Sequence, residues 1–204
     1  MPHKCFISYK KEDEKYKDKI LKKLGQERIK GRALNKWIDS DNIDHIMQVI
    51  RNDYMKNTSV TIFLIGNHSS ENEGLDENNN DKNAYIKREL QATLYNRKNF
   101  KRSGLLGVVL PSMESKIYKG KILCKKCGRK YNKIILNDKT VIREFSANYF
   151  LKKDLECQHS QNGNFCVLVR YCNFMDNPDK YINMAYDKLN DPISEEVHWK
   201  DLRK

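Results

Sequence analysis

Val60-Thr61-Ile62-Phe63-Leu64-Ile65-Gly66 is a nearly continuous apolar run that ends in a glycine. A short run of this kind is typical of a strand that is buried on both faces of a parallel sheet. Similar runs occupy residues 4–8, 33–38, 105–110 and 165–171. The sequence therefore predicts a sheet of about five strands whose central members face protein on both sides.

Segments with apolar side chains at helical spacing lie between these runs. The apolar stripes fall within residues 16–24, 43–54, 86–94 and 181–189. Ser40 or Asp41 is the expected N-cap of the second helix, and Asn177-Pro178 is expected to open the last one. Alternation of strand and helix predicts an α/β fold with right-handed crossovers. The chain length favours a flavodoxin-like parallel sheet flanked by helices.

Residues 112–164 interrupt this alternation before the last predicted strand. They contain Cys124-Lys125-Lys126-Cys127-Gly128 and a predicted hairpin that pairs residues 133–136 with residues 140–145. We interpret the segment as a basic, cysteine-containing insertion between the fourth and fifth strands. With this insertion, the chain fits a single domain that spans residues 1–204.

Composition and charge limit the classes of function. Hydrophobic residues make up 39% of the chain and charged residues 32%, which is polar but compatible with a folded domain. The formal net charge is +12, and residues 101–143 hold twelve Lys or Arg against Glu114 and Asp138. Such a segment attracts the phosphates of nucleic acid or of a dinucleotide, although a solvated basic surface is the more common role.

The N-terminus lacks the basic region and long apolar segment of a signal peptide. No apolar run approaches the roughly 18 residues of a membrane-spanning helix. We therefore expect a cytoplasmic protein with no membrane partner.

Ligands of open α/β sheets bind at the carboxyl ends of the strands, near the point where the strand order reverses. In flavodoxin-like order this point lies between the first and third strands. The residues expected to line it are Ser8, Tyr9 and Lys10 after the first strand, Trp37, Asp39, Ser40 and Asp41 after the second, and Gly66 and Asn67 after the third. Their hydroxyls, aromatic rings, cation and backbone N–H groups suit a phosphate-bearing nucleoside. The same residue types also commonly do no more than end strands or pack at a rim.

Tyr85 and Glu89 lie four residues apart and therefore share one side of the third predicted helix. A carboxylate near a ribose can stabilise the positive charge that develops when the bond to nicotinamide breaks, much as in glycoside hydrolysis. The leaving group is neutral, so a general acid is not obligatory. A glutamate on a helix rich in Lys and Arg is, however, most often a solvated surface residue. Spacing alone leaves both roles open.

Three segments together resemble TIR domains. They are Phe6-Ile7-Ser8-Tyr9, residues 57–66 and Tyr85-Ile86-Lys87-Arg88-Glu89-Leu90. The segments are similar to the bacterial TIR-like family that includes the TIR subunit of the Thoeris anti-phage system, and the resemblance covers residues 3–111. It implies that NAD+ is the substrate and that Glu89 is the catalytic residue of an NAD+ nucleosidase or ADP-ribosyl cyclase.

The resemblance also places Ser8, Tyr9 and Lys10 in the first substrate-lining loop and residues 37–41 in the second. Tyr85 stands where a tryptophan is common in this family. The acidic, Asn-rich loop of residues 70–83 is longer than usual, and we expect it to be mobile.

The family implies a set of partners besides NAD+. They are a downstream effector reached through a cyclic ADP-ribose-type messenger and a phage-derived trigger. A homo-oligomer is a further candidate that the sequence leaves open. Two other classes of function stay open from the sequence. One is a non-enzymatic TIR interaction or sensor module, in which Glu89 is incidental. The other is a nucleic-acid-binding protein that uses the basic insertion, with Tyr118 and Tyr131 as stacking candidates.

The chain has six cysteines, which in a cytosolic protein argues for free thiols or a metal site rather than disulfides. Cys124-x-x-Cys127-Gly128 has the form of a zinc knuckle, and Cys157 with His159 is expected to complete a tetrahedral structural zinc site. Cys166 is another candidate for the fourth ligand. Free thiols in a basic loop are the alternative. Cys5 and Cys172 are expected to be core or edge residues of the sheet.

Overall fold

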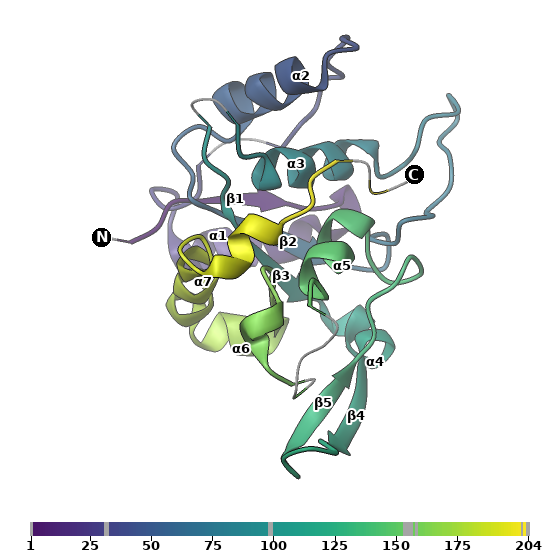
Figure 1. Ribbon diagram of the computed structural model, residues 1–204. Helices are drawn as coiled ribbons and strands as arrows, with labels where there is room; N and C mark the ends of the chain where they lie inside the picture. Colours follow the sequence, from purple (N-terminus) through teal and green to yellow (C-terminus); the bar gives the residue numbers. More distant parts are fainter. Residues whose placement is uncertain are drawn as a thin grey trace.

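A computed structural model describes residues 2–30, 33–97, 100–152, 157, 159–200 and 202. Its centre is a four-stranded parallel sheet in the order β1-β2-β3-β6 (Figure 1). The strands are β1 (Cys5–Ser8), β2 (Val60–Ile65), β3 (Gly104–Val109) and β6 (Val167–Arg170). Every residue of β1, β2 and β3 is buried, as expected from their continuous apolar sequences. The α/β fold class predicted from the sequence is confirmed.

Helices cover both faces of this sheet. They are α1 (Glu14–Leu24), α2 (Ile43–Val49) with a π-helical continuation (Ile50–Tyr54), α3 (Ala84–Leu94), α4 (Glu114–Ile117), α5 (Arg143–Tyr149), α6 (Tyr171–Asp176) and α7 (Pro178–Asp187). Short 3₁₀ turns occupy Lys11–Asp13, Pro111–Met113, Gln161–Gly163 and Pro192–Glu196. Within the described residues, no helix combines the length and the apolar character that crossing a membrane requires.

Strand β2 shows how the two faces are built. Phe63 and Ile65 pack in a cluster with residues of α2, α3 and α5, whereas Ile62 and Leu64 pack in a second cluster with residues of α1, α6 and α7. This alternation follows from the two-residue period of a strand. The sheet is therefore the middle layer of three, and α3 lies over the face that carries Phe63 and Ile65.

The strand predicted over residues 33–38 does not form. A single parallel bridge between Cys5 and Ile29 takes its place at the free edge of β1, with Cys5 N–H donating to Arg28 O and Lys30 N–H donating to Cys5 O, both at 2.8 Å. Residues 33–42 are irregular because Leu34 N–H donates to the Glu89 carboxylate instead of to a neighbouring strand. Within the described residues the sheet consequently has four strands rather than about five.

The predicted hairpin of residues 133–136 and 140–145 is also wrong. The hairpin instead pairs β4 (Tyr118–Leu123) with β5 (Lys130–Ile134), and it projects from the body of the protein (Figure 1). Residues 137–140 form a turn in which Thr140 N–H donates to Asn137 O at 2.8 Å. Helix α5 follows this turn, because Phe145 and Tyr149 are spaced to bury one helical face.

One predicted helix cap is wrong and the other is confirmed. Asn42 caps α2 in place of Ser40 or Asp41, since its side-chain oxygen accepts from His45 N–H at 3.1 Å. Asn177 caps α7 as predicted, with its side chain accepting from Lys180 N–H at 3.2 Å and Pro178 at the first helical position.

The segment interpreted as an insertion has a buried half and an exposed half. Phe145 of α5 lies 5.9 Å from Phe63, measured between ring centroids, and so belongs to the core of the sheet. A Cβ atom at Gly107 would lie 2.4 Å from the Phe145 ring, so β3 needs glycine there. The strands of the β4–β5 hairpin are mostly exposed. The single-domain interpretation with an insertion at 112–164 stays a prediction.

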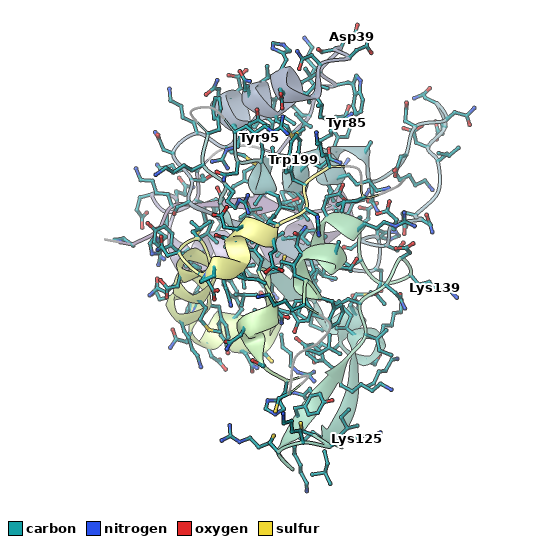
Figure 2. All side chains as sticks on the ribbon, in the orientation of Figure 1. Asp39, Tyr85, Tyr95, Lys125, Lys139 and Trp199 are labelled. Atoms are coloured by element: carbon teal, nitrogen blue, oxygen red, sulfur yellow. The ribbon has the colours of Figure 1, made fainter. Side chains whose placement is uncertain are left out.

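The last described segment crosses back over the layer that holds α3. Trp199 packs edge-on against Tyr95, which follows α3, with 5.0 Å between the ring centroids (Figure 2). Tyr95 is fully buried and Trp199 nearly so. Helix α3 is therefore held between the sheet on one side and the C-terminal segment on the other.

Candidate active site

Glu89 lies in the middle of α3 and is 2% exposed. Its Oε2 accepts from the Ser8 hydroxyl at 2.6 Å, and its Oε1 accepts from Leu34 N–H at 2.7 Å. Ser8 is the last residue of β1, so the carboxylate sits at the carboxyl edge of the sheet. Three segments that are distant in sequence therefore meet at one carboxyl group.

The packing of α3 on the sheet fixes the position of the Glu89 carboxylate. Thr93 donates its hydroxyl to the carbonyl oxygen of Glu89 at 2.9 Å. The same hydroxyl lies 2.8 Å from that of Thr61, which explains the one polar residue inside β2. The two threonines are fully buried and link the helix to the central strand.

The surroundings of Glu89 change its acidity. Burial raises the pKa of Glu89 to about 7, and the hydrogen bonds from the Ser8 hydroxyl and the Leu34 N–H oppose that rise. Near neutral pH the group therefore exists in both protonated and ionised forms. A carboxyl group with this pKa can accept or donate a proton at the operating pH, as general acid–base chemistry requires.

An aromatic pair lies on the outer side of this site. Trp37, in the segment that follows Leu34, and Tyr85, one turn before Glu89, stand edge to face with 6.0 Å between ring centroids. The Arg88 guanidinium carbon is 5.7 Å from the centre of the Trp37 ring. Trp37 is 50% exposed and Tyr85 39% exposed, so both rings offer a surface to a planar ligand.

The rest of the predicted second loop is less closely tied to the site. Asp39 and Asp41 are exposed, and Figure 2 shows Asp39 at the outer tip of the loop before α2. The Ser40 hydroxyl accepts from Asn42 N–H at 3.1 Å. Trp37 is therefore the residue of this loop that the structure brings next to α3.

The loop after β1 contributes Tyr9 and Lys10. Tyr9 is half-buried, and burial raises the pKa of its hydroxyl while Lys17 opposes the rise. The ammonium group of Lys17 lies 5.5 Å from the centre of the Tyr9 ring. The Lys10 ammonium donates to the backbone oxygen of Lys82 at 2.6 Å. Lys10 thus joins the loop after β1 to the long loop before α3.

A second buried carboxyl group, which the sequence did not indicate, belongs to Asp13 in the 3₁₀ turn after β1 and lies against Gly66 in the turn after β2. A Cβ atom at Gly66 would lie 2.0 Å from Asp13 Oδ2, so glycine permits this close approach. Asp13 is 7% exposed, and burial raises the pKa of its side chain. Within the described part of the chain, Asp13 Oδ2 has no hydrogen-bond partner. Asn67 is exposed and accepts from the Lys116 ammonium at 3.5 Å.

The two ends of the long loop of residues 70–83 are held by contacts with α3 and α5, whereas residues 74–80 between them are exposed, and the expected mobility of the loop stays a prediction. Glu71 is 5% exposed, and its Oε1 lies 3.0 Å from the ammonium group of Lys87 on α3. Its Oε2 accepts from Arg143 N–H at the start of α5 at 2.9 Å. Asp81 also pairs with Lys87. The acidic composition of the loop thus serves a buried ion pair rather than solvation alone.

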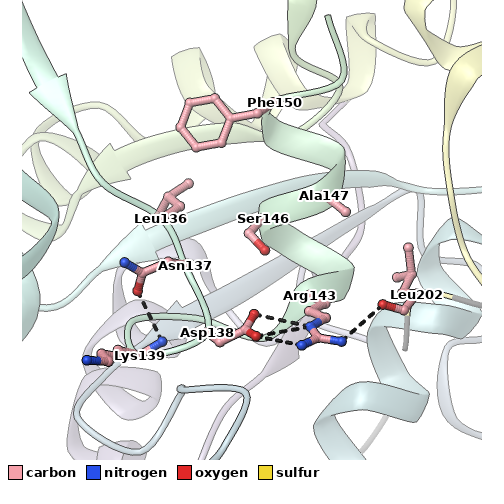
Figure 3. A pocket seen from close by; sticks show the side chains of 9 residues that line it. All are labelled: Leu136, Asn137, Asp138, Lys139, Arg143, Ser146, Ala147, Phe150 and Leu202. Atoms are coloured by element: carbon pink, nitrogen blue, oxygen red, sulfur yellow. Dashed lines mark hydrogen bonds and ion pairs between the residues drawn. The ribbon is translucent and has the colours of Figure 1, made fainter. Parts of the chain in front are cut away.

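A separate hollow lies between the turn of residues 137–139 and α5 (Figure 3). Its volume is about 630 Å³, and an ion pair between Arg143 and Asp138 spans it, with 2.6 Å between Nη2 and Oδ2. The Arg143 guanidinium also donates to the Leu202 carbonyl at 3.4 Å. These groups satisfy one another, so the hollow is a weaker candidate for chemistry than the Glu89 site.

The predicted metal ligands converge. The ligand atoms of Cys124, Cys127, Cys157 and His159 all lie within 4.8 Å of one another. Cys166 is buried elsewhere, and its thiol donates to the Phe145 carbonyl at 3.7 Å. The prediction that Cys166 is a candidate fourth ligand is therefore wrong. Cys5 is buried in β1, and Cys172 is exposed in α6.

The two stacking candidates of the insertion contact other side chains of the chain. The Arg170 guanidinium carbon is 4.0 Å from the centre of the Tyr118 ring. The Tyr131 ring lies 5.4 Å from that of His159. Both tyrosines are partly buried, so neither presents a fully open face to a nucleic-acid base.

Comparison with known families gives one match. Residues 6–115 match the family described as the TIR-like domain of the Thoeris protein ThsB. The matched segment runs from β1 into α4 and contains Ser8, Tyr85 and Glu89, whereas the cysteine residues of the hairpin lie beyond it. No curated protein matches the chain.

Proposed function

The chain belongs to the TIR-like domain family of the Thoeris protein ThsB, and on that premise we propose that it cleaves NAD+ with Glu89 as the catalytic carboxylate. Family membership supports a role in defence. The observation that carries the proposed activity is the position of Glu89, a buried carboxyl group with a pKa of about 7 at the carboxyl edge of a parallel sheet. Ligands of parallel sheets bind at this edge, and a carboxylate there can stabilise a developing positive charge.

In the proposed reaction the bond between C1′ of the nicotinamide ribose and the pyridinium nitrogen breaks. Its electron pair leaves with nicotinamide, which becomes neutral, and the ribose passes through an oxocarbenium-like state. The ionised Glu89 stabilises this positive charge. The oxygen of a water molecule then bonds to C1′, and its proton passes to Glu89 or to solvent, which yields ADP-ribose. In the cyclising version a nucleophilic atom of the same substrate molecule takes the place of water.

Glu89 is closed to substrate in this conformation, because both of its oxygens accept hydrogen bonds and the residue is 2% exposed. We propose that the segment of residues 33–41 moves when the enzyme acts, so that Leu34 N–H leaves Oε1. Ser8 would keep its bond to Oε2 and act as the positioning residue. Trp37 and Tyr85 would receive a planar ring of the substrate.

Asp13 is the second polar group that the proposal uses. Its Oδ2 is buried at the same edge of the sheet and has no partner among the described residues. An acceptor of this kind is costly unless it is protonated or bound by a donor. We propose that a hydroxyl group of the substrate donates to it.

The biological setting follows from the family. We propose that the product is a cyclic ADP-ribose-type messenger that activates a separate effector, and that a phage-derived trigger opens the site. Contact with a second copy of the chain is a further way in which residues 33–41 could be displaced.

A non-enzymatic interaction or sensor module is the second candidate function. The observation that favours it is that the Glu89 carboxylate is fully paired within the chain, as a purely structural carboxylate would be. In that role Glu89 only links β1, the segment after Ile29 and α3. The alternative function as a nucleic-acid-binding protein rests on the basic charge of residues 101–143. It predicts nucleic-acid binding that weakens steeply as the salt concentration rises.

Product analysis separates these candidates. Purified protein is incubated with NAD+, with and without lysate of phage-infected cells, and the nucleotides are resolved by chromatography with mass spectrometry. Release of nicotinamide with ADP-ribose or a cyclic isomer supports the enzyme and identifies the messenger. Intact NAD+ with the infected lysate, from protein whose fold is verified by circular dichroism, supports the non-enzymatic module.

A further inference from the structure

We propose that Cys124, Cys127, Cys157 and His159 bind one structural zinc ion, which clips the β4–β5 hairpin to the segment that precedes β6. The site lies outside the segment that matches the TIR-like family. It is independent of the proposed NAD+ cleavage, and either proposal can fail without the other.

The geometry suits a tetrahedral ion. The four ligand atoms lie within 4.8 Å of one another, and Cys127 Sγ is 3.0 Å from His159 Nε2. Zinc–sulfur and zinc–nitrogen bonds of ordinary length place tetrahedral ligand atoms about 3.5–3.8 Å apart. Shifts of about an ångström or less would therefore bring all four atoms to bonding distance.

The local backbone positions the first two proposed ligands, Cys124 and Cys127. Cys124 and Cys127 occupy the turn between β4 and β5, where Gly128 N–H donates to Cys124 O and Cys124 N–H donates to Arg129 O, both at 2.9 Å. Gly128 has φ of +70°, a conformation that favours glycine, and no atom crowds its Cβ position. The glycine after the second cysteine is thus needed for the turn that aims both sulfurs at one point.

The second pair comes from a distant segment. Cys157 and His159 lie between α5 and β6, where Ser160 N–H donates to Cys157 O at 2.9 Å and closes a turn. Donors from two turns, separated by about 30 residues of chain, form a closed set of four protein ligands. A closed set is the mark of a structural site, whereas a catalytic zinc keeps one open position.

Tyr118 and Ile134 at the base of the hairpin pack against the core, but the rest of the hairpin has few apolar contacts. Both of its strands are mostly exposed, and Figure 1 shows it extending away from the sheet. Ile122 is 37% exposed and Leu123 61% exposed, so the hairpin buries few of its apolar side chains. An isolated two-stranded hairpin is marginally stable in water, and small elements without a core commonly depend on a metal.

The local charge also fits the bound state. Three thiolates and a neutral imidazole on Zn²⁺ carry a net charge of −1. Lys125, Lys126, Arg129 and Lys130 surround the turn, and Figure 2 shows Lys125 at its tip. These cations offset the charge of the thiolates. Soft sulfur ligands select zinc over magnesium or calcium, which prefer oxygen.

A zinc ion here would also shape the surface beside it. A cavity of about 730 Å³ lies between the hairpin and β6, and Tyr131, Ile134, His159 and Arg170 are among the residues that line it. His159 belongs both to this wall and to the ligand set. The ion would therefore fix one wall of the cavity.

The test is the metal content of the full-length chain. Protein purified from zinc-supplemented medium is analysed by plasma mass spectrometry, for the wild type and for Cys124→Ser, Cys157→Ser and His159→Ala. Cys172→Ser is the matched control, because Cys172 is exposed but lies outside the cluster. We expect one zinc ion per chain in the wild type and in the control, and loss of most zinc in the other three variants.

Two further measurements keep the test decisive if a variant folds poorly. Cobalt substituted into the wild type should give the absorption of a tetrahedral thiolate site. Chelation of zinc from the wild type should raise tryptic cleavage at Lys125 and Lys126 about tenfold while the core stays protected. Wild-type protein that takes up no zinc from zinc chloride, contains iron instead, or has these cysteines joined in a disulfide would overturn the proposal.

Discussion

The Glu89 site and the cysteine cluster of the hairpin are built in opposite ways. Glu89 is held by Ser8 and Leu34, which are 81 and 55 residues away, and the chain itself satisfies both carboxylate oxygens. The four proposed metal ligands come from two short turns, and their side chains contact one another, with Cys127 Sγ 3.0 Å from His159 Nε2. The first site is complete without a ligand and must open to work. The second, in our proposal, is held together by a bound zinc ion.

The ion pair of Lys87 gives the largest effect expected on the stability of the first region. Lys87→Met removes the cation that pairs with the buried Glu71 carboxylate and with Asp81, and we expect a loss of about 3 kcal/mol in the free energy of unfolding. Denaturant unfolding followed by circular dichroism measures this loss.

The control for that prediction is an ion pair that lies closer to solvent. Lys152 and Glu196 form a half-exposed pair at 3.1 Å, so Lys152→Met should cost about 0–1 kcal/mol. Equal losses for the two variants would contradict the expected contrast between a buried and a half-exposed ion pair.

The pH dependence of stability tests the burial of Glu89. Its pKa is raised from 4.5 to about 7 on folding, so the folded state binds the proton more tightly than the unfolded state. The corresponding stabilisation is complete below pH 4.5 and is lost as the pH rises to about 7. At 1.36 kcal/mol per pKa unit the loss is about 3 kcal/mol.

Glu89→Gln removes this titration while keeping the shape of the side chain. Its amide oxygen can accept from Leu34 N–H, and its amide nitrogen can donate to the Ser8 hydroxyl. Unfolding free energies from pH 4.5 to pH 7.5 should therefore show the variant gaining stability relative to the wild type as the pH rises. A constant difference across this range would mean that Glu89 is solvated.

Two glycines extend the comparison to the backbone. A Cβ atom at Gly104 would lie 2.2 Å from the Ala185 carbonyl oxygen, so Gly104→Ala should cost about 2–3 kcal/mol. Gly120 in the hairpin has φ of +82° with open space around it, and Gly120→Ala should cost about 1 kcal/mol. Thermal unfolding of both variants measures the difference, and a larger loss at Gly120 would contradict it.

Trp37 gives the smallest expected effect. If Trp37 and Tyr85 receive a planar ring of NAD+, Trp37→Ala should raise KM for NAD+ by about tenfold and leave kcat within about twofold. Asp39→Ala serves as the control, since Asp39 is exposed at the tip of the same loop. A fall in kcat with an unchanged KM would contradict the proposed contact between Trp37 and NAD+.

The sequence predicted those parts of the fold that depend on local pattern. The apolar runs identified β1, β2, β3 and β6 because each strand is buried on both faces. The sequence did not indicate that residues 33–38 form no strand, because the Leu34 N–H donates to a carboxylate 55 residues away. It misplaced the hairpin because Asn137-Asp138 was taken as the hairpin turn, whereas Cys124 and Gly128 make it.

The candidate site was predicted only in part for the same reason. Family resemblance indicated Glu89, and the cysteine spacing indicated the four side chains that cluster beside the hairpin. The burial of Glu89 could not be inferred, since Lys87 and Arg88 beside it suggest a solvated helix. Asp13 was missed because its close approach to Gly66 is a tertiary contact. The pairing of Glu71 with Lys87 was likewise hidden by the acidic composition of the loop.

The most direct test of the account compares the initial rates of NAD+ consumption by wild type, Glu89→Gln and Glu144→Gln in the same activating lysate. Glu144 is a fully buried glutamate of α5 whose Oε1 accepts from the Gln91 side chain at 2.7 Å, so it matches Glu89 in burial. We predict a rate at least about 10³-fold lower for Glu89→Gln and little change for Glu144→Gln. Turnover by folded Glu89→Gln at the wild-type rate would contradict the catalytic role of Glu89.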